Sequence, residues 1–500
     1  MAKFCWPYFD PDFDGLSERV YGPVCRVTID NESSDECTVL KIDSVNKQGL
    51  LLEVVQALTD MNLTILKSYI SSDAGWFMDV FHVKDGSGNK VTDQNVINYI
   101  QKAIGANKEA MVKARARNTK FLESKTSAHE PTAIEMRGKD RPGLFSEISA
   151  ALADLHINVV EAHAWSHNAR LACVAYISDQ STSSPIDDHR LATIEDHLTT
   201  VLRATTSQNT GDDVCTNQQE VKHFAGLPDH GRWEGTMTDV ERRLHQLMLS
   251  VRDFDGPPSA SGPSSSWPRS TANIPLGGHD DEEEREKKEC QVRIESCDEK
   301  GYSIVTVSCK DRRRLMFDTV CTLTDLQYVI FHASVDSDEG YAFQEYFIRH
   351  VDGCALNTEG EKERVIKCLE AAIERRVCEG IRLELRATNR VGLLSDITRV
   401  LRENGLAVVR ADIATQGENA VNAFYVRDMS GNDVDMEFIK TMKREMGPID
   451  LDVKNETPII RRTSPGNGNG NGSGNGRPRF SVGDILRSHV ERLSHNIAIG

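Results

Sequence analysis

The chain has 500 residues, of which 39% are hydrophobic and 27% are charged, with a formal net charge of −17 at pH 7. This length predicts three or four domains rather than a single core. The acidic balance argues against broad binding to a nucleic-acid backbone, which needs clustered Lys and Arg.

Targeting and redox signals indicate the interior of the cell. The N-terminal residues contain no apolar signal segment, and no run approaches the roughly 18 apolar residues of a membrane span. Twelve cysteines without a CxxC pair indicate reduced thiols rather than a zinc site or a disulfide framework. We expect a soluble cytoplasmic protein; the alternative is the nucleus, because residues 113–117 read KARAR, although this run also fits one basic face of a helix.

One unit of about 80 residues occurs four times along the chain. Each copy has a β-rich run, an amphipathic helix, two more β-rich runs and a second helix. The first runs are Thr38–Asp43, Thr132–Arg137, Tyr302–Cys309 and Ile381–Ala387. The first helices open with the pairs Leu50-Leu51, Leu144-Phe145, Leu315-Met316 and Leu393-Leu394, and apolar residues follow each pair at helical spacing. The second helix of the fourth copy is expected over Phe438–Met446, and a final strand is legible only there, at Ile449–Val453.

This order predicts an α+β protein built from four ferredoxin-like βαββαβ modules, each with an antiparallel sheet and both helices on one face. Because such a sheet leaves its other face open, we expect the modules to associate with one another. The boundaries expected are 1–35 for an N-terminal segment, 36–115 for module 1, 130–206 for module 2, 207–289 for a linker, 290–378 for module 3, 379–455 for module 4 and 456–500 for a tail.

The linker and the tail have their own patterns. An amphipathic helix is expected to start at Thr238, with Glu241 completing a capping box, and the Pro/Ser-rich and acidic stretches at 256–270 and 280–289 indicate disorder. The Gly/Asn-rich run at 464–478 is typical of a flexible tether. A short helix from Ser481 fits a docking helix and a fraying tail equally well.

The loop between the first strand and the first helix recurs with a shared pattern. It reads NKQGL from Asn46, DRPGL from Asp140, DRRRL from Asp311 and NRVGL from Asn389. The Asp or Asn is placed to cap the helix, the glycine allows close approach of a ligand, and the N–H groups at a helix start attract an anion such as a carboxylate. Spacing alone is fitted somewhat better by a loop that only caps and turns, with nothing bound.

The residues now support a resemblance. DRPGL followed by an amphipathic helix and INVVEA resembles the ACT domain, a small βαββαβ regulatory module. The stretch from Glu36 to Val83 resembles the first module of the plant ACT-repeat (ACR) proteins, which carry four such modules and no catalytic domain. The resemblance extends over about residues 24–455. It implies amino-acid ligands held between paired modules by the first loop and helix start, at the following residues: Asn46, Gly49 and Leu50; Asp140, Gly143 and Leu144; Asn389, Gly392 and Leu393.

Module 3 departs from the pattern, because Arg314 stands where the other copies have glycine. A long side chain there obstructs close approach of a backbone or ligand. We expect this loop to be structural or to bind a different anion.

Enzymatic activity is a competing hypothesis, because modules resembling these also end the bacterial uridylyltransferases. Nucleotidyl transfer needs paired carboxylates beside a Gly-Ser loop, whereas Asp450 and Asp452 form a lone DxD and His279-Asp280 lies in the acidic linker. The sequence contains no GxSxG, P-loop or HExxH motif. We therefore expect a protein that is not an enzyme, without cofactor or metal.

Two further alternatives are weaker. RNA binding through Trp76, Phe77 and Phe81 is suggested by the shared order of RRM domains, but Asp79 in the same strand and the overall acidity oppose it. His163 and His167 form a conceivable metal pair that lacks a third ligand, and ordinary packing is favoured.

The sequence therefore predicts a non-catalytic, amino-acid-binding regulatory or sensor protein that signals through rearrangement of its modules. The expected partners are a free amino acid and an unidentified protein, with modules paired within the chain, a homodimer as an option, and neither nucleic acid nor a membrane span. The alternative is a protein–protein interaction scaffold with vestigial ligand sites.

Overall fold

The computed structural model describes most of the predicted modules. The described residues are 25–45, 48–73, 76–104, 131–179, 186–204, 219–224, 236–256, 290–297, 299–338, 340–376, 381–416, 418–429, 439, 442–444, 446 and 449–454. The KARAR run, the linker at 257–289, the tether at 464–478 and the helix expected from Ser481 lie outside these residues. None of the helices in the described part is long and apolar enough to cross a membrane.

Modules 1 and 2 have the following elements. Module 1 comprises β1 (Arg26–Asp30), β2 (Thr38–Val45), α2 (Leu50–Asp60), β3 (Thr64–Asp73), β4 (Trp76–Lys84) and α3 (Gln94–Ile104). Module 2 comprises β5 (Thr132–Lys139), α5 (Leu144–Asp154), β6 (Ile157–His167), β7 (Arg170–Asp179), α6 (Asp188–Arg203) and β8 (Glu220–Phe224).

Modules 3 and 4 repeat the arrangement. Module 3 comprises β9 (Gln291–Cys297), β10 (Tyr302–Lys310), α8 (Leu315–Asp325), β11 (Tyr328–Asp338), β12 (Tyr341–His350) and α9 (Glu359–Glu374). Module 4 comprises β13 (Ile381–Thr388), α10 (Leu393–Glu403), β14 (Leu406–Gln416), β15 (Asn419–Asp428) and β16 (Asp450–Lys454). Its second helix, expected over Phe438–Met446, lies largely outside the described residues, although Ile439 and Met442–Arg444 are helical.

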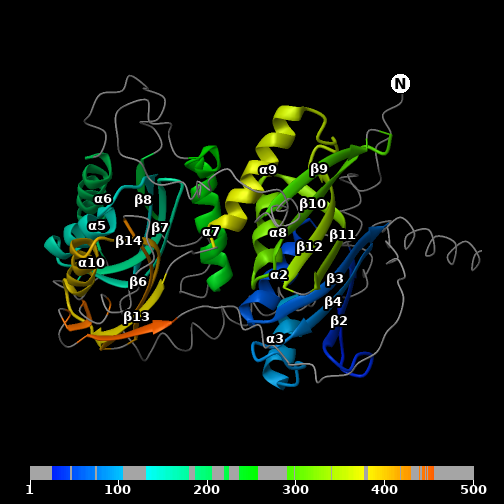
Figure 1. The fold of residues 1–500 in the computed structure, drawn as a ribbon, viewed down its shortest axis with the longest axis horizontal. Helices are drawn as coiled ribbons and strands as arrows, with labels where there is room; N and C mark the ends of the chain where they lie inside the picture. The colour runs from blue at the N-terminus through cyan, green and yellow to red at the C-terminus, as the bar shows by residue number, and fades with distance from the viewer. Residues whose placement is uncertain are drawn as a thin grey trace, which may run out of the picture. The chain divides into compact units, whose positions relative to one another are not determined.

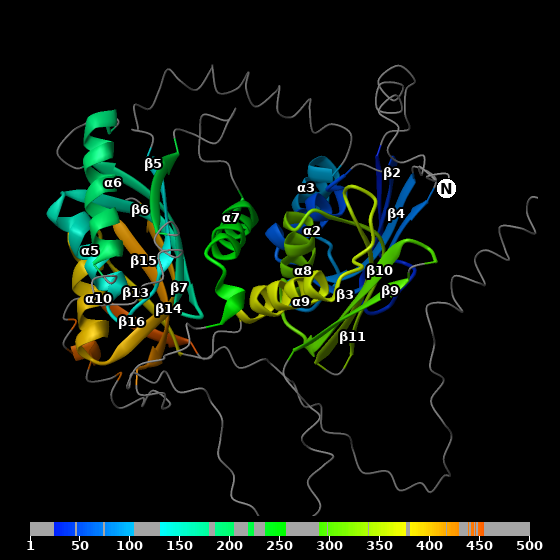
Figure 2. The ribbon, with the colours of Figure 1, turned by 90° about the horizontal axis from the view of Figure 1, so that it is seen from above.

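The modules pair in two non-sequential couples, 1 with 3 and 2 with 4. The first couple forms one eight-stranded sheet in the order β1-β2-β4-β3-β11-β12-β10-β9, and the second forms another in the order β16-β13-β15-β14-β6-β7-β5-β8 (Figures 1 and 2). The joining strands are antiparallel, β3 with β11 and β6 with β14. This edge-to-edge pairing satisfies the backbone groups that each module alone would leave open.

The edge strand beside the first strand comes from different ends of the module. In modules 2 and 4 it follows the second helix, as β8 and β16, in the βαββαβ order. In modules 1 and 3 it precedes the first strand, as β1 and β9, so the order written from the sequence is wrong at that one element. Either source fills the same place, because both strands run antiparallel to the first strand.

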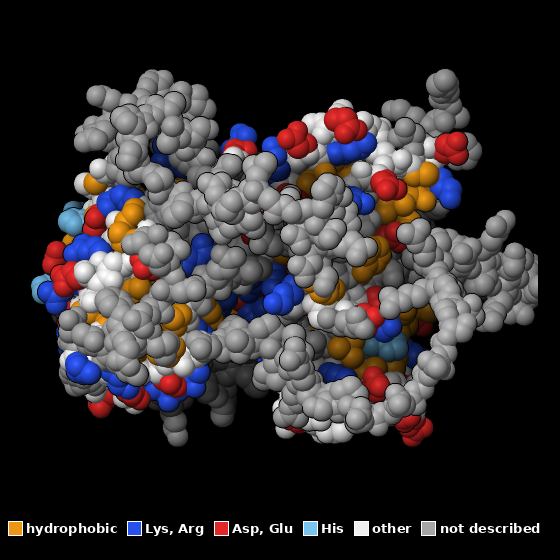
Figure 3. Space-filling view, in the orientation of Figure 1, with side chains coloured by type: hydrophobic (Ala, Val, Ile, Leu, Met, Phe, Trp, Pro, Cys, Tyr) orange, Lys and Arg blue, Asp and Glu red, His pale blue; other side chains and the backbone are white. Residues whose placement is uncertain are grey.

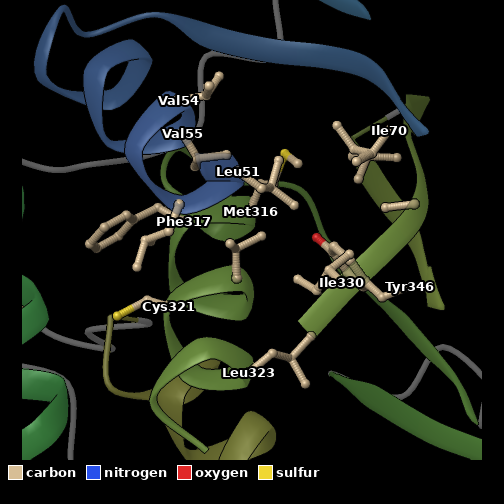
Figure 4. Packing of buried hydrophobic residues seen from close by; sticks show 14 of the residues in the cluster. Leu51, Val54, Val55, Ile70, Met316, Phe317, Cys321, Leu323, Ile330 and Tyr346 are labelled. Atoms are coloured by element: carbon tan, nitrogen blue, oxygen red, sulfur yellow. The ribbon is translucent and has the colours of Figure 1, made fainter. Parts of the chain in front are cut away.

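The core of each couple lies between its sheet and its helices. Figure 4 shows Leu51 and Val55 of α2 beside Met316 and Phe317 of α8, above strand residues that include Tyr346. In the other couple, the hydroxyls of Ser149 and Thr398 lie 2.7 Å apart, which joins α5 to α10. Both couples therefore bring their first helices together across the seam between modules.

Helix α7 (Met237–Ser250) covers the open face of module 2. Its buried residues Val240, Leu244, Leu247 and Met248 form one cluster with Trp165, Ala172 and Val174, which lie on the sheet face turned away from α5 and α6. The capping box is formed by Thr236 and Asp239 rather than Thr238 and Glu241, so the expected helix start is corrected by two residues. The hydroxyl of Thr238 instead donates to Asp60 of α2 at 3.0 Å.

Candidate ligand site at the seam between modules 2 and 4

The first helices begin at a residue in the left-handed conformation. Gly49, Gly143 and Gly392 have φ of 82°, 85° and 81°, which glycine adopts without the clash of a Cβ atom. No side chain caps the starts of α5 and α10, so the expectation that Asp140 and Asn389 cap these helices is wrong. The N–H groups of Leu144 and Leu393 donate to the loop carbonyls of Arg141 and Arg390, at 3.1 and 3.2 Å, so the N–H groups of the next residues in each helix are the ones that face a ligand without an intrahelical acceptor.

The loop Asp and Asn residues have other partners. In module 2, Asp140 accepts from the hydroxyl of Ser166 and, at 2.8 Å, from the N–H of Arg141. In module 4, the amide of Asn389 donates across the seam to Asn158 Oδ1 of module 2 at 3.4 Å. Asn389 thus joins its own loop to the partner module. Asn46, the equivalent in module 1, lies outside the described residues.

A cavity lies beside Gly392 at this seam. It encloses about 410 Å³, including the space open to solvent. Module 4 contributes the loop Asn389–Gly392, the helix start Leu393–Ser395 and strand residues that include Ala420 and Asn422, and module 2 contributes residues of α5 and β6 that include Ala153 and Asn158. The predicted residues Asn389, Gly392 and Leu393 are therefore brought together around a hollow.

The equivalent seam position beside Gly143 is covered by a side chain. A Cβ atom on Gly143 would lie 2.8 Å from Cδ of Arg402, a residue of α10. Arg402 is the ninth residue after Leu393, and Ala153 is the ninth after Leu144, so the two residues hold equivalent places on α10 and α5. The small residue leaves the Gly392 seam open, whereas the arginine covers the Gly143 seam. The predicted residues Asp140, Gly143 and Leu144 lie together at the start of α5, but Arg402 packs against Gly143 there.

Burial alters the Asp140 carboxyl near that covered position. Desolvation raises its pKa to about 6, although hydrogen bonds from Ser166 and Arg141 and the charge of Arg141 act in the opposite direction. Leu144, next along the helix, is fully buried. The Gly143 seam therefore holds a carboxyl with a raised pKa, unlike the Gly392 seam, where an amide takes this place.

In the couple of modules 1 and 3, the two loops also differ. A Cβ atom on Gly49 would meet nothing within 4 Å, and Leu50 is buried in the core. Arg314 takes the left-handed conformation of the glycines, with φ of 66°, at a cost of about 1 kcal/mol for a residue with a side chain. Its guanidinium pairs with Glu241 of α7, and Arg313 donates to Asn62 Oδ1 at 3.2 Å in module 1. The anion that this loop binds is a carboxylate of the same chain.

Glu241 belongs to a buried ionic cluster between α7 and module 3. It accepts two hydrogen bonds from Arg376, at 2.8 and 2.9 Å, and Arg376 also donates to Asp318 at 2.6 Å. Burial opposes the charge of Glu241, but Arg376 and Arg314 outweigh it and lower the pKa of the carboxyl. The guanidinium of Arg376 lies 5.1 Å from the ring centroid of Trp165 in module 2. The cluster therefore connects the two couples through α7.

The residues named for the alternative hypotheses have structural roles. Phe77 and Phe81 are buried in the core of module 1, where they cannot stack on bases. His163 lies between Asp412 Oδ1, at 2.9 Å, and Glu161 Oε1, at 2.8 Å, while His167 contacts Asp253 Oδ2 at 2.8 Å. Among the described residues, no group of His, Cys, Asp and Glu is arranged to hold a metal ion. On the face shown in Figure 3, basic and acidic side chains are interspersed over modules 2 and 4.

The residues predicted from the sequence did not include three that line the open cavity: Ala153, Asn158 and Asn422. A signal for the first was present, because aligning the four copies on their first helical leucine places Thr59, Ala153, Thr324 and Arg402 at one position. For Asn422, the same alignment carried into the third strand shows polar residues in three of the four copies.

Comparison with known proteins agrees with the repeated architecture. The profile of the ACR family N-terminal ACT domain matches residues 33–111, and that of the ACT domain matches residues 132–181. The chain is 62% identical over 514 residues to the ACT domain-containing protein ACR2 of Arabidopsis thaliana, covering 99% of each chain. The chain belongs to the ACR family of ACT-domain proteins.

Other relatives set the extent of this similarity. The ACT domain-containing protein ACR3 of Arabidopsis thaliana is 50% identical over 463 residues, which cover 92% of this chain and 93% of that protein. A bifunctional uridylyltransferase/uridylyl-removing enzyme of Azospirillum brasilense is 37% identical over 86 residues, which cover 17% of this ACR chain and 9% of the enzyme. The likeness to that enzyme is thus confined to a segment the size of one module, whereas the ACR relatives match along nearly their whole length.

Proposed function

We propose that this chain is a non-catalytic regulatory protein that binds a free amino acid in the cavity between modules 2 and 4. The observation that supports the proposal is the hollow beside Asn389, Gly392 and Leu393, at the place where the family resemblance expects a ligand. The protein would act in the cytoplasm or the nucleus.

The chemistry of the cavity suits a zwitterion. The start of α10 offers N–H groups without intrahelical acceptors and the positive end of the helix dipole, both of which favour a carboxylate. The side-chain oxygens of Asn389 in module 4 and Asn158 in module 2 can accept hydrogen bonds from the ammonium group of the ligand. A ligand held in this way contacts both modules at once and stabilises their pairing.

Regulation follows from the same contact. An amino acid that binds only the paired modules stabilises that state by an amount that rises with the logarithm of its concentration above Kd. It shifts an equilibrium only through a difference in affinity between two states. Helix α7 packs against module 2, and its residue Glu241 forms an ion pair with Arg376 of module 3. We propose that α7 passes the change at the seam to the other couple and to a protein partner.

A scaffold function is the second candidate, and the covered seams favour it. Arg402 lies over Gly143, and Arg313 and Arg314 tie the module 3 loop to module 1 and α7. If the open cavity is also a vestigial site that no longer binds a ligand, the chain is a scaffold for protein–protein interactions.

Calorimetry and thermal shift with each of the twenty amino acids distinguish the two functions. The wild-type protein should bind at least one amino acid at millimolar concentration or below. Ala153→Arg, which places at the open seam the residue that covers the twin seam, should abolish this binding. Ala150→Arg in the same helix is the matched control, because Ala150 is also half-buried and does not line the cavity. Absence of binding to the wild-type protein would establish the scaffold instead.

Small-angle scattering tests the regulatory part separately. Saturating ligand should change the profile of the wild-type protein and leave that of Ala153→Arg unchanged. An unchanged scattering profile of the wild-type protein would contradict the proposed rearrangement of the modules. It would leave the proposed binding of an amino acid intact.

A further inference from the structure

The side chain of Asn422 is the unusual polar group of the open cavity. Asn422 lies on β15, is 2% exposed and lines the cavity. Its Oδ1 atom has no hydrogen-bond partner within the described residues. A buried acceptor left without a donor is unfavourable, so a donor brought by a ligand would be favoured there.

The repeat shows that this position does not have to be an unsatisfied amide. Asn422 lies opposite Leu385 and Ile413 in its sheet, and the residues with the same pairing in modules 1, 2 and 3 are Asp79, Cys173 and Gln344. The Gln344 Oε1 atom accepts a hydrogen bond from the Tyr346 hydroxyl at 2.9 Å, so module 3 satisfies its amide internally. Module 2 places a nearly apolar thiol there. In module 1, both carboxylate oxygens of Asp79 are also without a hydrogen-bond partner within the described residues. Asn422 differs in that it lines the cavity beside its own glycine loop.

The remaining lining of the cavity carries almost no charge. Arg390 is the single ionisable residue among those that line it. Its guanidinium is exposed and donates to Asp396 Oδ2 at 2.5 Å, so its charge is already paired, and its Nη1 atom lies 3.8 Å from the place of a Cβ atom on Gly392. The other lining side chains are neutral, among them Ser149, Asn158 and Thr415. A charged ligand side chain would lose its hydration there without a counter-charge.

We propose that this cavity selects amino acids whose side chain is uncharged and carries a hydrogen-bond donor, an amide or a hydroxyl, which donates to Asn422 Oδ1. The class comprises glutamine, asparagine, serine and threonine. Asn422 is thus the specificity-determining residue of the site. This inference rests on the proposed function, because it assumes that the cavity holds an amino acid.

Calorimetric titration of the full-length protein with seven amino acids tests the selection. Members of the class should bind at least about tenfold more tightly than leucine, glutamate and lysine. Leucine and ionised glutamate leave the buried acceptor of Asn422 unpaired, whereas lysine loses the hydration of its charge without a counter-charge. Asn422→Leu should weaken binding of the class at least about tenfold and leave leucine binding equal or tighter. Asn422→Cys, which borrows the residue of module 2, should behave in the same way.

The controls separate the inference from the proposed function. Asn419→Leu, at an exposed position of the same strand, should change none of the affinities. If leucine, glutamate or lysine binds most tightly and Ala153→Arg abolishes this binding, the ligand site stands and the selection is wrong. The selection is also wrong if Asn422→Leu weakens leucine and glutamine equally, since Asn422 then contacts a group common to all amino acids. No binding to the wild-type protein would overturn both.

Discussion

Removal of the Arg402 side chain should open a second ligand site. Arg402 lies over Gly143, with its Cδ 2.8 Å from the place of a Cβ atom, while the equivalent Ala153 leaves the Gly392 seam open. Arg402→Ala therefore gives both seams of this couple the same small residue. We expect the number of amino acids bound per chain to rise by one relative to the parent protein.

The affinity of the new site can be worked from its lining. Cys173 stands where the open seam has Asn422, so the new site lacks one hydrogen-bond acceptor, with a net worth of about 0.5–1.5 kcal/mol. Binding should be roughly 2- to 13-fold weaker than in the open seam. The stability loss should stay near 0.3–1 kcal/mol, because Arg402 is exposed and contributes mainly as a cation in the last turn of α10.

Isothermal titration with the amino acid that the parent binds best measures this change. The isotherm of the parent should fit one class of site. The isotherm of Arg402→Ala should fit two classes, of which the second is the weaker. Arg399→Ala, an exposed arginine of the same helix, is the control and should keep the parent stoichiometry. A folded Arg402→Ala protein with unchanged stoichiometry would refute the idea that this side chain blocks a site.

Three further predictions concern buried ionisable groups. Burial raises the pKa of Asp79 well above its ordinary value of 3.8, so ionisation of this carboxyl favours the unfolded chain as the pH rises from about 4. Asp79→Asn should therefore stabilise the protein at pH 7 by about 1–3 kcal/mol, measured by urea titration. This gain should disappear near pH 4. Burial opposes the charge of His163, but its two carboxylate partners outweigh it and raise the pKa from 6.5 to about 9; unfolding free energy should fall between these pH values, and His163→Gln should flatten that slope. Glu241→Gln should cost about 3–5 kcal/mol, because it leaves the buried Arg376 with less counter-charge.

The substitution of Glu241 has a matched control. Glu359→Gln removes an exposed carboxylate that is 89% accessible and should change stability by less than about 0.5 kcal/mol. An Asp79→Asn protein that is less stable than the parent at pH 7 would show that the carboxylate has a favourable partner. A pH slope unaltered by His163→Gln would contradict the raised pKa, and a cost for Glu241→Gln no larger than that of the control would contradict the role given to the cluster.

The sequence was sufficient for the modules because their signals are local. The leucines at 50, 144, 315 and 393 each open a helix at the predicted residue, since the apolar stripe of each helix is written within eleven residues. The pairing of modules is different. It is made by backbone hydrogen bonds between edge strands, and these carry little information about which edge meets which.

The site was predictable only in part for the same reason. The glycine loops identified three candidate positions, including Gly392, but whether a position is open depends on a residue of the partner module, Ala153 or Arg402. That residue becomes informative once the partner is known. The Glu241 cluster was beyond prediction, because its members come from α7, α8 and the end of α9, which are far apart in the sequence.

The interleaved pairing of the modules has a consequence for biosynthesis. Lys67 of β3 meets Asp336 of β11, 269 residues later, so the edge of β3 waits for its partner about 13–54 s at translation rates of roughly 5–20 residues per second. During that interval the nascent chain presents an unpaired strand edge that another copy can fill. Ribosomes on one messenger RNA hold such edges close together, and exchange of modules between sister chains is the error to which this connectivity is most exposed.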